Sequence, residues 1–246
     1  MAKLERPLEG STMTEVSRRG DQVLREAGPW TPTIQRLLTH LREQGLDWVP
    51  EPQGWTNDGR EALSYLKGKV PTYPLPEWVY SDATLKRAAK WLRRLHDATE
   101  GYEDADAHWR TAPHKPAEVI CHNDFAPYNM VFRDQELVGV IDWDFATPGP
   151  RLWDLAYLCY RTVPLMRPAN PDAPDLPIDL AARVQLALAA YGTDVTVPEL
   201  LAVIVERLED LAAFTHSHGL ARKSDKLLLD AENYSADAAY LRNLLH

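Results

Sequence analysis

The sequence predicts an α+β fold of two lobes, a small sheet-rich N-terminal lobe and a larger helical C-terminal lobe. The first quarter of the chain consists of short segments broken by Gly and Pro, which are typical of strands and turns. From Arg151 onward almost every segment has helical spacing of apolar residues, apart from a Pro-rich loop at 164–177. Residues 67–78 are rich in Pro and Lys and indicate a connector, so we place the domains at 1–67 and 68–246.

Strands are expected mainly in the N-terminal lobe. The chain over residues 6–26 has the composition of two or three strands, with turns at Gly10 and Gly20. Residues 61–66 form a further predicted strand, and residues 119–121 a short one in the C-terminal lobe.

Two amphipathic helices are expected in the first hundred residues. The first covers residues 31–45, where Thr31 can cap the start and Gly45 ends the helix. The second covers residues 82–99. Their buried faces consist of Ile34, Leu37, Leu38 and Leu41 in the first helix, and Leu85, Ala88, Ala89, Leu92 and Leu95 in the second.

Composition excludes several classes of protein. The 246 residues carry 27 Lys+Arg against 36 Asp+Glu, a net charge of -9, so we expect neither a nucleic-acid partner nor an anionic membrane. Cys121 and Cys159 lie among apolar residues and are expected to be buried thiols. The N-terminus lacks the apolar core of a signal peptide, and no run approaches the roughly 20 apolar residues that span a bilayer. These observations favour a cytoplasmic protein.

Polar side chains interrupt an apolar stretch at CHNDFAPYNMVF, residues 121–132. The chain continues as strand, polar turn and strand over residues 130–141, which predicts a tight hairpin. A hairpin returns the chain to its starting point, so Asn129 and Asp142 should lie side by side at its open end. Asp124 lies on the loop that leads into the first strand. Three oxygen-bearing side chains therefore converge.

Converging carboxylate and amide oxygens suit Mg²⁺, which completes its shell with phosphate oxygens and water. Phosphoryl transfer uses these parts: an Asp that orients the acceptor hydroxyl, an Asn five residues later, and an Asp after a hairpin, the last two on the metal. The alternative is that each residue caps a turn. The joint spacing with an intervening hairpin favours phosphoryl transfer.

The segments HNDFAPYN, VIDWD and WDLAY together resemble the aminoglycoside phosphotransferase family, which has a protein-kinase-like fold. The resemblance extends through nearly the whole chain and includes VLREAGPWTP and LSYLKG in the N-terminal lobe. It implies that residues 1–67 form a nucleotide-binding lobe and residues 68–246 a catalytic and substrate-binding lobe.

The resemblance also implies roles for single residues. Asp124 would be the catalytic aspartate, and Asn129 and Asp142 would be the magnesium ligands. His122 would brace the catalytic loop. Asp154 would anchor that loop by accepting backbone N–H bonds.

Kinases place a lysine on the third strand to hold the nucleotide phosphates, and this sequence offers Arg25 instead. The alternative for Arg25 is a solvated position at a strand end. An acidic partner on the following helix could be Glu43, and His40 is also available there, so both stay open.

Two further nucleotide contacts are expected from the same resemblance. A phosphate-covering loop and an adenine-binding segment would be formed by Gly10, Ser11 and Thr12, and by Ser64, Tyr65 and Leu66, respectively. The alternatives are an ordinary turn and a plain buried strand.

Acidic residues gather before the catalytic loop and on a late helix. In this family's architecture the segment before the catalytic loop borders the acceptor pocket, so these carboxylates would meet the ammonium groups of a cationic acceptor. Solvated surface positions are the alternative. The candidates are Glu103, Asp104 and Asp106 in the loop, and Glu206, Glu209 and Asp210 on the helix.

The sequence therefore predicts a kinase that uses ATP or GTP and Mg²⁺ to phosphorylate a hydroxyl of a small molecule, such as an aminoglycoside-like antibiotic in a resistance function. One alternative is a kinase of a metabolite such as choline, homoserine or a sugar. Another is a catalytically inactive nucleotide-binding module, which the missing lysine favours and the intact Asp124, Asn129 and Asp142 oppose. Acceptor identity and oligomeric state have no motif in the sequence.

Overall fold

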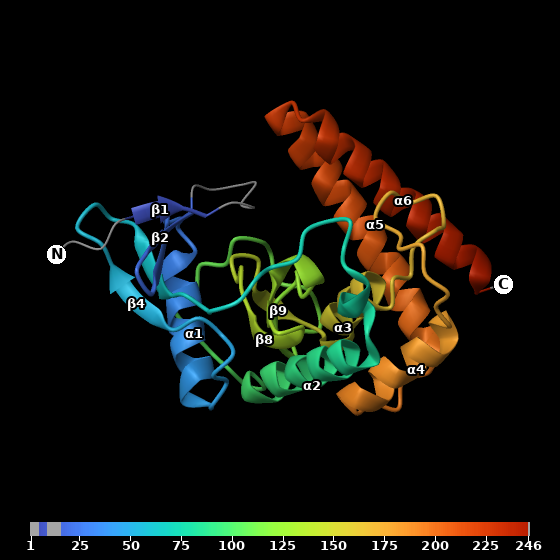
Figure 1. The fold of residues 1–246 in the computed structure, drawn as a ribbon, viewed down its shortest axis with the longest axis horizontal. Coiled ribbons are helices and arrows are strands. Elements are labelled where there is room, and N and C mark those ends of the chain that lie inside the picture. The colour runs from blue at the N-terminus through green and yellow to red at the C-terminus, as the bar shows by residue number, and fades with distance from the viewer. Residues whose placement is uncertain (1–4, 9–15, 246) are drawn as a thin grey trace. The chain divides into compact units, whose positions relative to one another are not determined.

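The computed structural model describes residues 5–8 and 16–245 and consists of two compact units (Figure 1). The first unit comprises Met1–Thr72 and Arg94–Pro150, and the second comprises Tyr73–Arg93 and Arg151–His246. The chain first passes between the units within the predicted connector. Residues 94–150 belong to the first unit with the N-terminal strands, although they follow the connector in sequence.

An antiparallel five-stranded sheet in the first unit has the strand order β1-β2-β3-β5-β4. Gly20 has a φ of 67° in the turn between β2 and β3, as predicted, whereas Gly10 lies outside the described residues. Arg25 at the end of β3 stands opposite Glu61 at the start of β5. The strands are β1 Glu5–Pro7, β2 Val16–Arg19, β3 Gln22–Arg25, β4 Pro52–Trp55 and β5 Glu61–Ser64.

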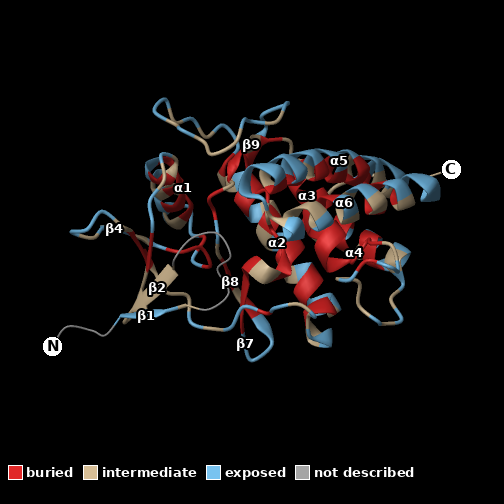
Figure 2. Cartoon of the chain, turned by 90° about the horizontal axis from the view of Figure 1, so that it is seen from above, coloured by how far each residue is buried: buried red, intermediate tan, exposed pale blue. Residues whose placement is uncertain are grey.

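The predicted first helix is α1, Thr31–Glu43, and its apolar face is buried (Figure 2). Gly45 follows it with a φ of 79°, as expected for a residue that ends a helix. The prediction that Thr31 caps the helix is wrong, because Trp30 occupies the cap position. Thr31 is the first helical residue, and its hydroxyl accepts a hydrogen bond from the N–H of Gly28 at 2.9 Å.

Two small antiparallel pairs complete the first unit. β7, Met130–Arg133, pairs with β8, Glu136–Val140, and confirms the predicted hairpin. Asp134 and Gln135 make its turn with φ values of 52° and 64°. β6, Val119–Cys121, pairs with β9, Thr147–Gly149, a strand that the sequence pattern did not reveal.

The second unit is helical, as predicted. α2 begins in this unit and ends in the first, and its five predicted apolar positions are all buried. α5 and α6 lie side by side in both views (Figures 1 and 2). Within residues 5–8 and 16–245, no helix is long and apolar enough to cross a membrane. The helices are α2 Asp82–Ala98, α3 Arg151–Thr162, α4 Leu180–Tyr191, α5 Val197–Arg222 and α6 Asp225–Leu244.

The Pro-rich loop of the second unit is held by buried charges. Asp237 on α6 is fully buried and accepts hydrogen bonds from the N–H of Arg167 at 3.1 Å and from Nδ2 of Asn170 at 2.5 Å. The Tyr160 hydroxyl donates a third bond to it at 2.7 Å. A buried carboxylate is tolerated when its lone pairs are satisfied in this way.

Candidate functional site

The β7–β8 hairpin brings Asn129 and Asp142 to the same end of the first unit. Met130 stands opposite Val140, and the N–H of Ile141 donates to the carbonyl of Asn129 at 2.8 Å. Asp142 follows directly and has a φ of 61°, which turns the chain sharply after β8. The predicted convergence at the open end of the hairpin is therefore present in the backbone.

Asp124 lies beside Asn129 and is held through both of its carboxylate oxygens. Nδ2 of Asn129 donates to Oδ2 of Asp124 at 2.8 Å and to its carbonyl at 3.0 Å. The Tyr128 hydroxyl donates to Oδ1 of Asp124 at 2.5 Å. Hydrogen bonds of this kind fix the orientation of the carboxylate. Tyr128 was not among the predicted site residues, although it stands inside the HNDFAPYN segment.

His122 connects the catalytic loop to the segment that precedes Asp142. Its Nδ1 accepts the N–H of Asp124 at 3.2 Å, and its Nε2 lies 3.1 Å from the carbonyl of Ile141. Both contacts are satisfied by the neutral tautomer that carries its proton on Nε2. The ring is fully buried and packs edge-on against the Trp143 ring, with 4.6 Å between the two ring centres. This position suits the bracing role inferred from the sequence.

Arg25 is buried among three carboxylates, so the interpretation of Arg25 as a solvated strand-end residue is wrong. Its Nε donates to Glu61, its Nη2 lies 2.6 Å from Asp144, and its Nη1 lies 3.9 Å from Asp142. The Arg25 side chain is 11% exposed and that of Glu61 is 0% exposed. Burial lowers the pKa of Arg25, but the facing carboxylates of Asp144, Glu61 and Asp142 outweigh this effect and raise it. Arg25 is therefore a fixed positive charge.

The acidic partner of Arg25 comes from strand β5 and not from helix α1. Of the two helix residues left open, Glu43 is exposed, and Nε2 of His40 meets the carbonyl of Ala98 at 2.7 Å. The helix contributes Gln35 instead, whose Nε2 lies 3.3 Å from Oε1 of Glu61. The signal for Glu61 is its register opposite Arg25, which composition alone does not determine.

Asp144 and Arg110 are two further site residues that sequence reasoning missed. Asp144 is buried two residues after Asp142 and pairs with Arg110 at 3.3 Å in addition to Arg25. The signal for Asp144 was the second acid of VIDWD. Arg110 lies in a loop with no pattern of its own, and only the folded chain reveals it.

The charge around Asp142 favours a bound cation. Its side chain is 49% exposed, yet partial burial and the neighbouring carboxylates of Asp144 and Asp124 raise the pKa of Asp142 to about 6. Water reaches the exposed half of the side chain and weakens the effect of burial there. Asn129 uses its amide nitrogen on Asp124, which leaves the amide oxygen as the atom that could bind a metal. Carboxylate and amide oxygens in this arrangement fit Mg²⁺.

The predicted nucleotide-binding segments have different outcomes. Gly10, Ser11 and Thr12 lie outside the described residues. The N–H groups of Ser64 and Tyr65 donate to the carbonyls of Glu51 and Asp21 at 2.8 and 2.9 Å. These two N–H groups are already used within the chain, and the contact of Ser64, Tyr65 and Leu66 with the adenine stays a prediction.

Half of the predicted acceptor carboxylates are already paired with arginines of the chain. Asp104 pairs with Arg36 at 2.8 Å, Glu209 pairs with Arg242, and Asp210 lies 4.0 Å from Arg207. The remaining three, Glu103, Asp106 and Glu206, are exposed. The loop residues belong to the first unit and the helix residues to the second.

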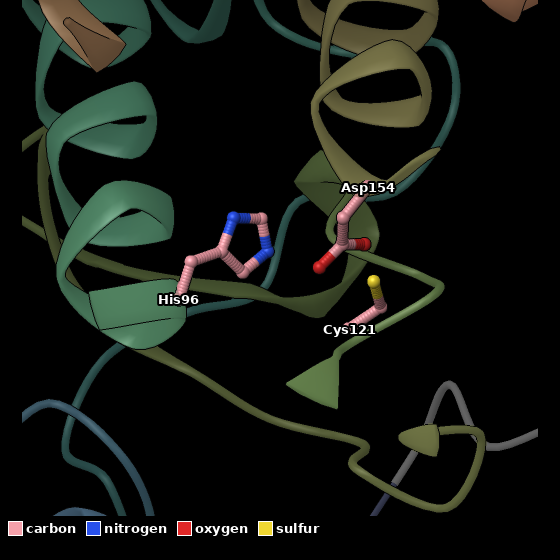
Figure 3. A group of neighbouring side chains, drawn as sticks. All are labelled: His96, Cys121 and Asp154. Atoms are coloured by element: carbon pink, nitrogen blue, oxygen red, sulfur yellow. The ribbon is translucent and has the colours of Figure 1, made fainter. Parts of the chain in front are cut away.

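Asp154 lies in the first turn of α3, in the second unit, and is fully buried (Figure 3). Its anchoring role stays a prediction. Figure 3 also shows His96 on α2 and Cys121 on β6, both fully buried in the first unit. Cys121 and Cys159 are free and buried, as predicted, and burial raises the pKa of the Cys159 thiol to about 12.

Comparisons with solved structures confirm the predicted α+β, protein-kinase-like fold. A choline/ethanolamine kinase family protein from Mesorhizobium loti superimposes with a TM-score of 0.65 at 18% identity, over 97% of this chain and 87% of that one. Spectinomycin phosphotransferase, APH(9)-Ia, in complex with ADP and spectinomycin, gives a TM-score of 0.63 at 12% identity, over 99% and 93%. The fold is thus that of kinase-like phosphotransferases.

Sequence comparison identifies the family. The model of the phosphotransferase enzyme family matches residues 70–174. The trifolitoxin immunity protein of Rhizobium leguminosarum bv. trifolii is 30% identical over 244 residues, which cover 94% of this chain and 82% of that protein. The chain belongs to the phosphotransferase enzyme family.

Proposed function

We propose that this protein transfers the γ-phosphoryl group of ATP or GTP to a hydroxyl of a small antibiotic-like molecule. The observation that carries the proposal is the held carboxylate of Asp124, which has Asn129 on one oxygen and Tyr128 on the other. A carboxylate fixed next to a metal-binding amide and a second carboxylate is the arrangement that phosphoryl transfer requires.

In this mechanism the hydroxyl oxygen of the acceptor forms a bond to the γ-phosphorus, and Asp124 accepts the proton that this hydroxyl loses. The bond between the γ-phosphorus and the bridging oxygen breaks, and the nucleoside diphosphate leaves. Asn129 and Asp142 would hold Mg²⁺, which neutralises charge on the phosphates when it is bound. Arg25 supplies a fixed positive charge beside Asp142. His122 keeps the backbone of Asp124 tied to the strand that ends before Asp142.

Two comparisons support an antibiotic-like acceptor. The trifolitoxin immunity protein is similar over nearly the whole chain, and its name describes protection against a toxic molecule. Spectinomycin phosphotransferase shares the fold and is bound to ADP and an antibiotic. Inactivation of a toxic compound by phosphorylation would account for both similarities.

The second candidate is a metabolite kinase of the choline or ethanolamine type, and a solved member of that class supports it through the shared fold. The paired state of Asp104, Glu209 and Asp210 speaks against these three as contacts for a cationic acceptor. Glu103, Asp106 and Glu206 are the remaining candidates for ammonium groups.

The test is phosphate transfer from γ-labelled ATP and from GTP, with and without Mg²⁺, to a panel of antibiotics, choline, ethanolamine, homoserine and sugars. The proposal expects Mg²⁺-dependent transfer to an antibiotic and none by the Asp124→Asn variant. Exclusive transfer to choline, ethanolamine or another metabolite would establish the second candidate. Nucleotide binding without transfer to any acceptor would point to an inactive module. A cationic acceptor should also bind more weakly as salt rises, because the Debye length falls to about 10 Å at 0.1 M.

A further inference from the structure

Arg110 lies between two aromatic side chains that come from distant parts of the first unit. Its guanidinium carbon is 4.4 Å from the centre of the Trp30 ring and 4.4 Å from that of Phe145. Trp30 stands immediately before α1, and Phe145 follows Asp144 in the turn after β8. A planar guanidinium can stack on aromatic faces and form an ion pair at its edge at the same time.

The edge of Arg110 meets the buried carboxylate of Asp144, which also binds Arg25. Nη1 of Arg110 lies 3.3 Å from Oδ2 of Asp144, and Nη2 of Arg25 lies 2.6 Å from Oδ1. The side chains of Asp144 and Arg110 are 10% and 16% exposed. Each oxygen of Asp144 therefore serves a different arginine.

Charge balance explains why the second arginine matters. Arg25 alone faces three carboxylates, those of Glu61, Asp144 and Asp142. Without Arg110, Asp144 would depend on Arg25 alone and would draw it away from Asp142, its most distant partner. Two arginines against three carboxylates leave Arg25 within reach of Asp142 and of a phosphate next to it.

The segment before α1 contains a glycine, Gly28, that leaves room for the Trp30 ring. A Cβ atom at Gly28 would lie 2.5 Å from the Trp30 ring, so only glycine lets the indole take its place there. Trp30 thereby links the start of α1 to Arg110, and Arg110 links it to Asp144 and Arg25. Nδ2 of Asn123 donates to the carbonyl of Phe145 at 2.9 Å and ties the same turn to the catalytic loop.

We propose that Arg110 is a positioning residue of the nucleotide site, which holds Asp144 and thereby keeps Arg25 beside Asp142. The inference rests on the proposed function, because it assigns Arg25 to the nucleotide phosphates. Arg110 itself does not touch the reacting atoms. It couples Trp30, the residue that precedes α1, to Arg25 through Asp144.

The experiment measures the affinity for Mg²⁺-ADP by calorimetry, together with the KM for ATP and for the acceptor. Arg110→Ala should weaken Mg²⁺-ADP binding and raise the KM for ATP by about 10- to 100-fold, the usual effect of losing a supporting residue behind a metal site. The KM for the acceptor should not change. Arg110→Lys keeps the charge but loses the stacking and the fork, so it should recover only part of the affinity.

Gly28→Ala supplies a variant without any change of charge. The added methyl group displaces Trp30, so nucleotide affinity should fall in the same direction as in Arg110→Ala. The control is Arg36→Ala, which removes an arginine that ties α1 to Asp104 and to the carbonyl of Asp106 but does not contact Asp144. Its nucleotide affinity should equal that of the wild type.

The outcomes separate the inference from the function beneath it. A wild-type protein that binds no nucleotide overturns the proposed function and the inference together. If the wild type binds Mg²⁺-ADP, and Arg110→Lys and Gly28→Ala bind it with the same affinity as the wild type, only the inference is overturned. Equal loss in Arg36→Ala would show general loosening of the 101–110 segment and would also overturn it. If Arg110→Ala does not fold, the melting temperature shows this, and the other two variants decide.

Discussion

Removal of the Arg25 charge should destabilise the protein far more than removal of a surface arginine. In Arg25→Met, Glu61 keeps only the weak hydrogen bond from Gln35 at 3.3 Å, and Asp144 keeps Arg110 at 3.3 Å. Breaking a buried pair by removing one partner costs about 3–5 kcal/mol. Because these two contacts remain, we expect the lower end, about 3 kcal/mol, a large part of a stability that totals about 5–15 kcal/mol.

The assay is urea unfolding followed by tryptophan fluorescence and circular dichroism. A loss of this size should lower the midpoint by about 1–3 M urea, given slopes of about 1–3 kcal/mol per M. The control is Arg242→Met, because Arg242 and its partner Glu209 are 47% and 50% exposed and their pair should contribute at most about 1 kcal/mol. The double variant Arg25→Met/Glu61→Leu should recover most of the loss, since it removes the uncompensated charge. Equal midpoint shifts for Arg25→Met and Arg242→Met, or a double variant no more stable than the single one, would refute the reasoning.

Three further predictions concern turnover and nucleotide binding. Asp124→Asn should lower turnover by about 100- to 10,000-fold while calorimetry still detects nucleotide binding, and near-normal turnover would remove Asp124 from the mechanism. Tyr128→Phe removes the hydrogen bond to Oδ1 of Asp124 and should lower kcat about tenfold or more without changing the KM for ATP; an unchanged kcat contradicts this. Asp142→Ala should weaken Mg²⁺-dependent nucleotide binding more than Asn129→Ala, because it removes a charge as well as a ligand. The measurement is a titration of each variant with Mg²⁺ in the presence of nucleotide, and a larger loss in Asn129→Ala would contradict the prediction.

The catalytic loop could be predicted from the sequence because its geometry is local. Asn129 and Asp142 are joined by a two-strand hairpin, so their approach follows from the turn and the strand lengths alone. His122 and Asp124 lie within a few residues of Asn129 for the same reason. The helices were also predictable, since apolar spacing determines their buried faces.

The arginine contacts could not be predicted in the same way. The pairing of Arg25 with Glu61 depends on strand register, and a slip of one residue would have placed a different side chain opposite Arg25. Asp210 could have been recognised as paired, because Arg207 lies three residues before it on the same helix. Arg36 and Arg242 reach Asp104 and Glu209 from far along the chain, and only the fold determines such distant pairs.

The use of arginine where kinases use lysine follows from the number of carboxylates that surround it. Three nitrogens of one guanidinium face three different acids: Nε faces Glu61, Nη2 faces Asp144 and Nη1 faces Asp142. An ammonium group is a compact charge on a flexible stem and lacks the rigid fork that reaches three directions at once. A lysine could satisfy Glu61 but would leave Asp142 without a fixed partner and Asp144 with Arg110 alone. The site therefore needs an arginine once the acidic partner lies on β5 and a second buried acid, Asp144, follows Asp142.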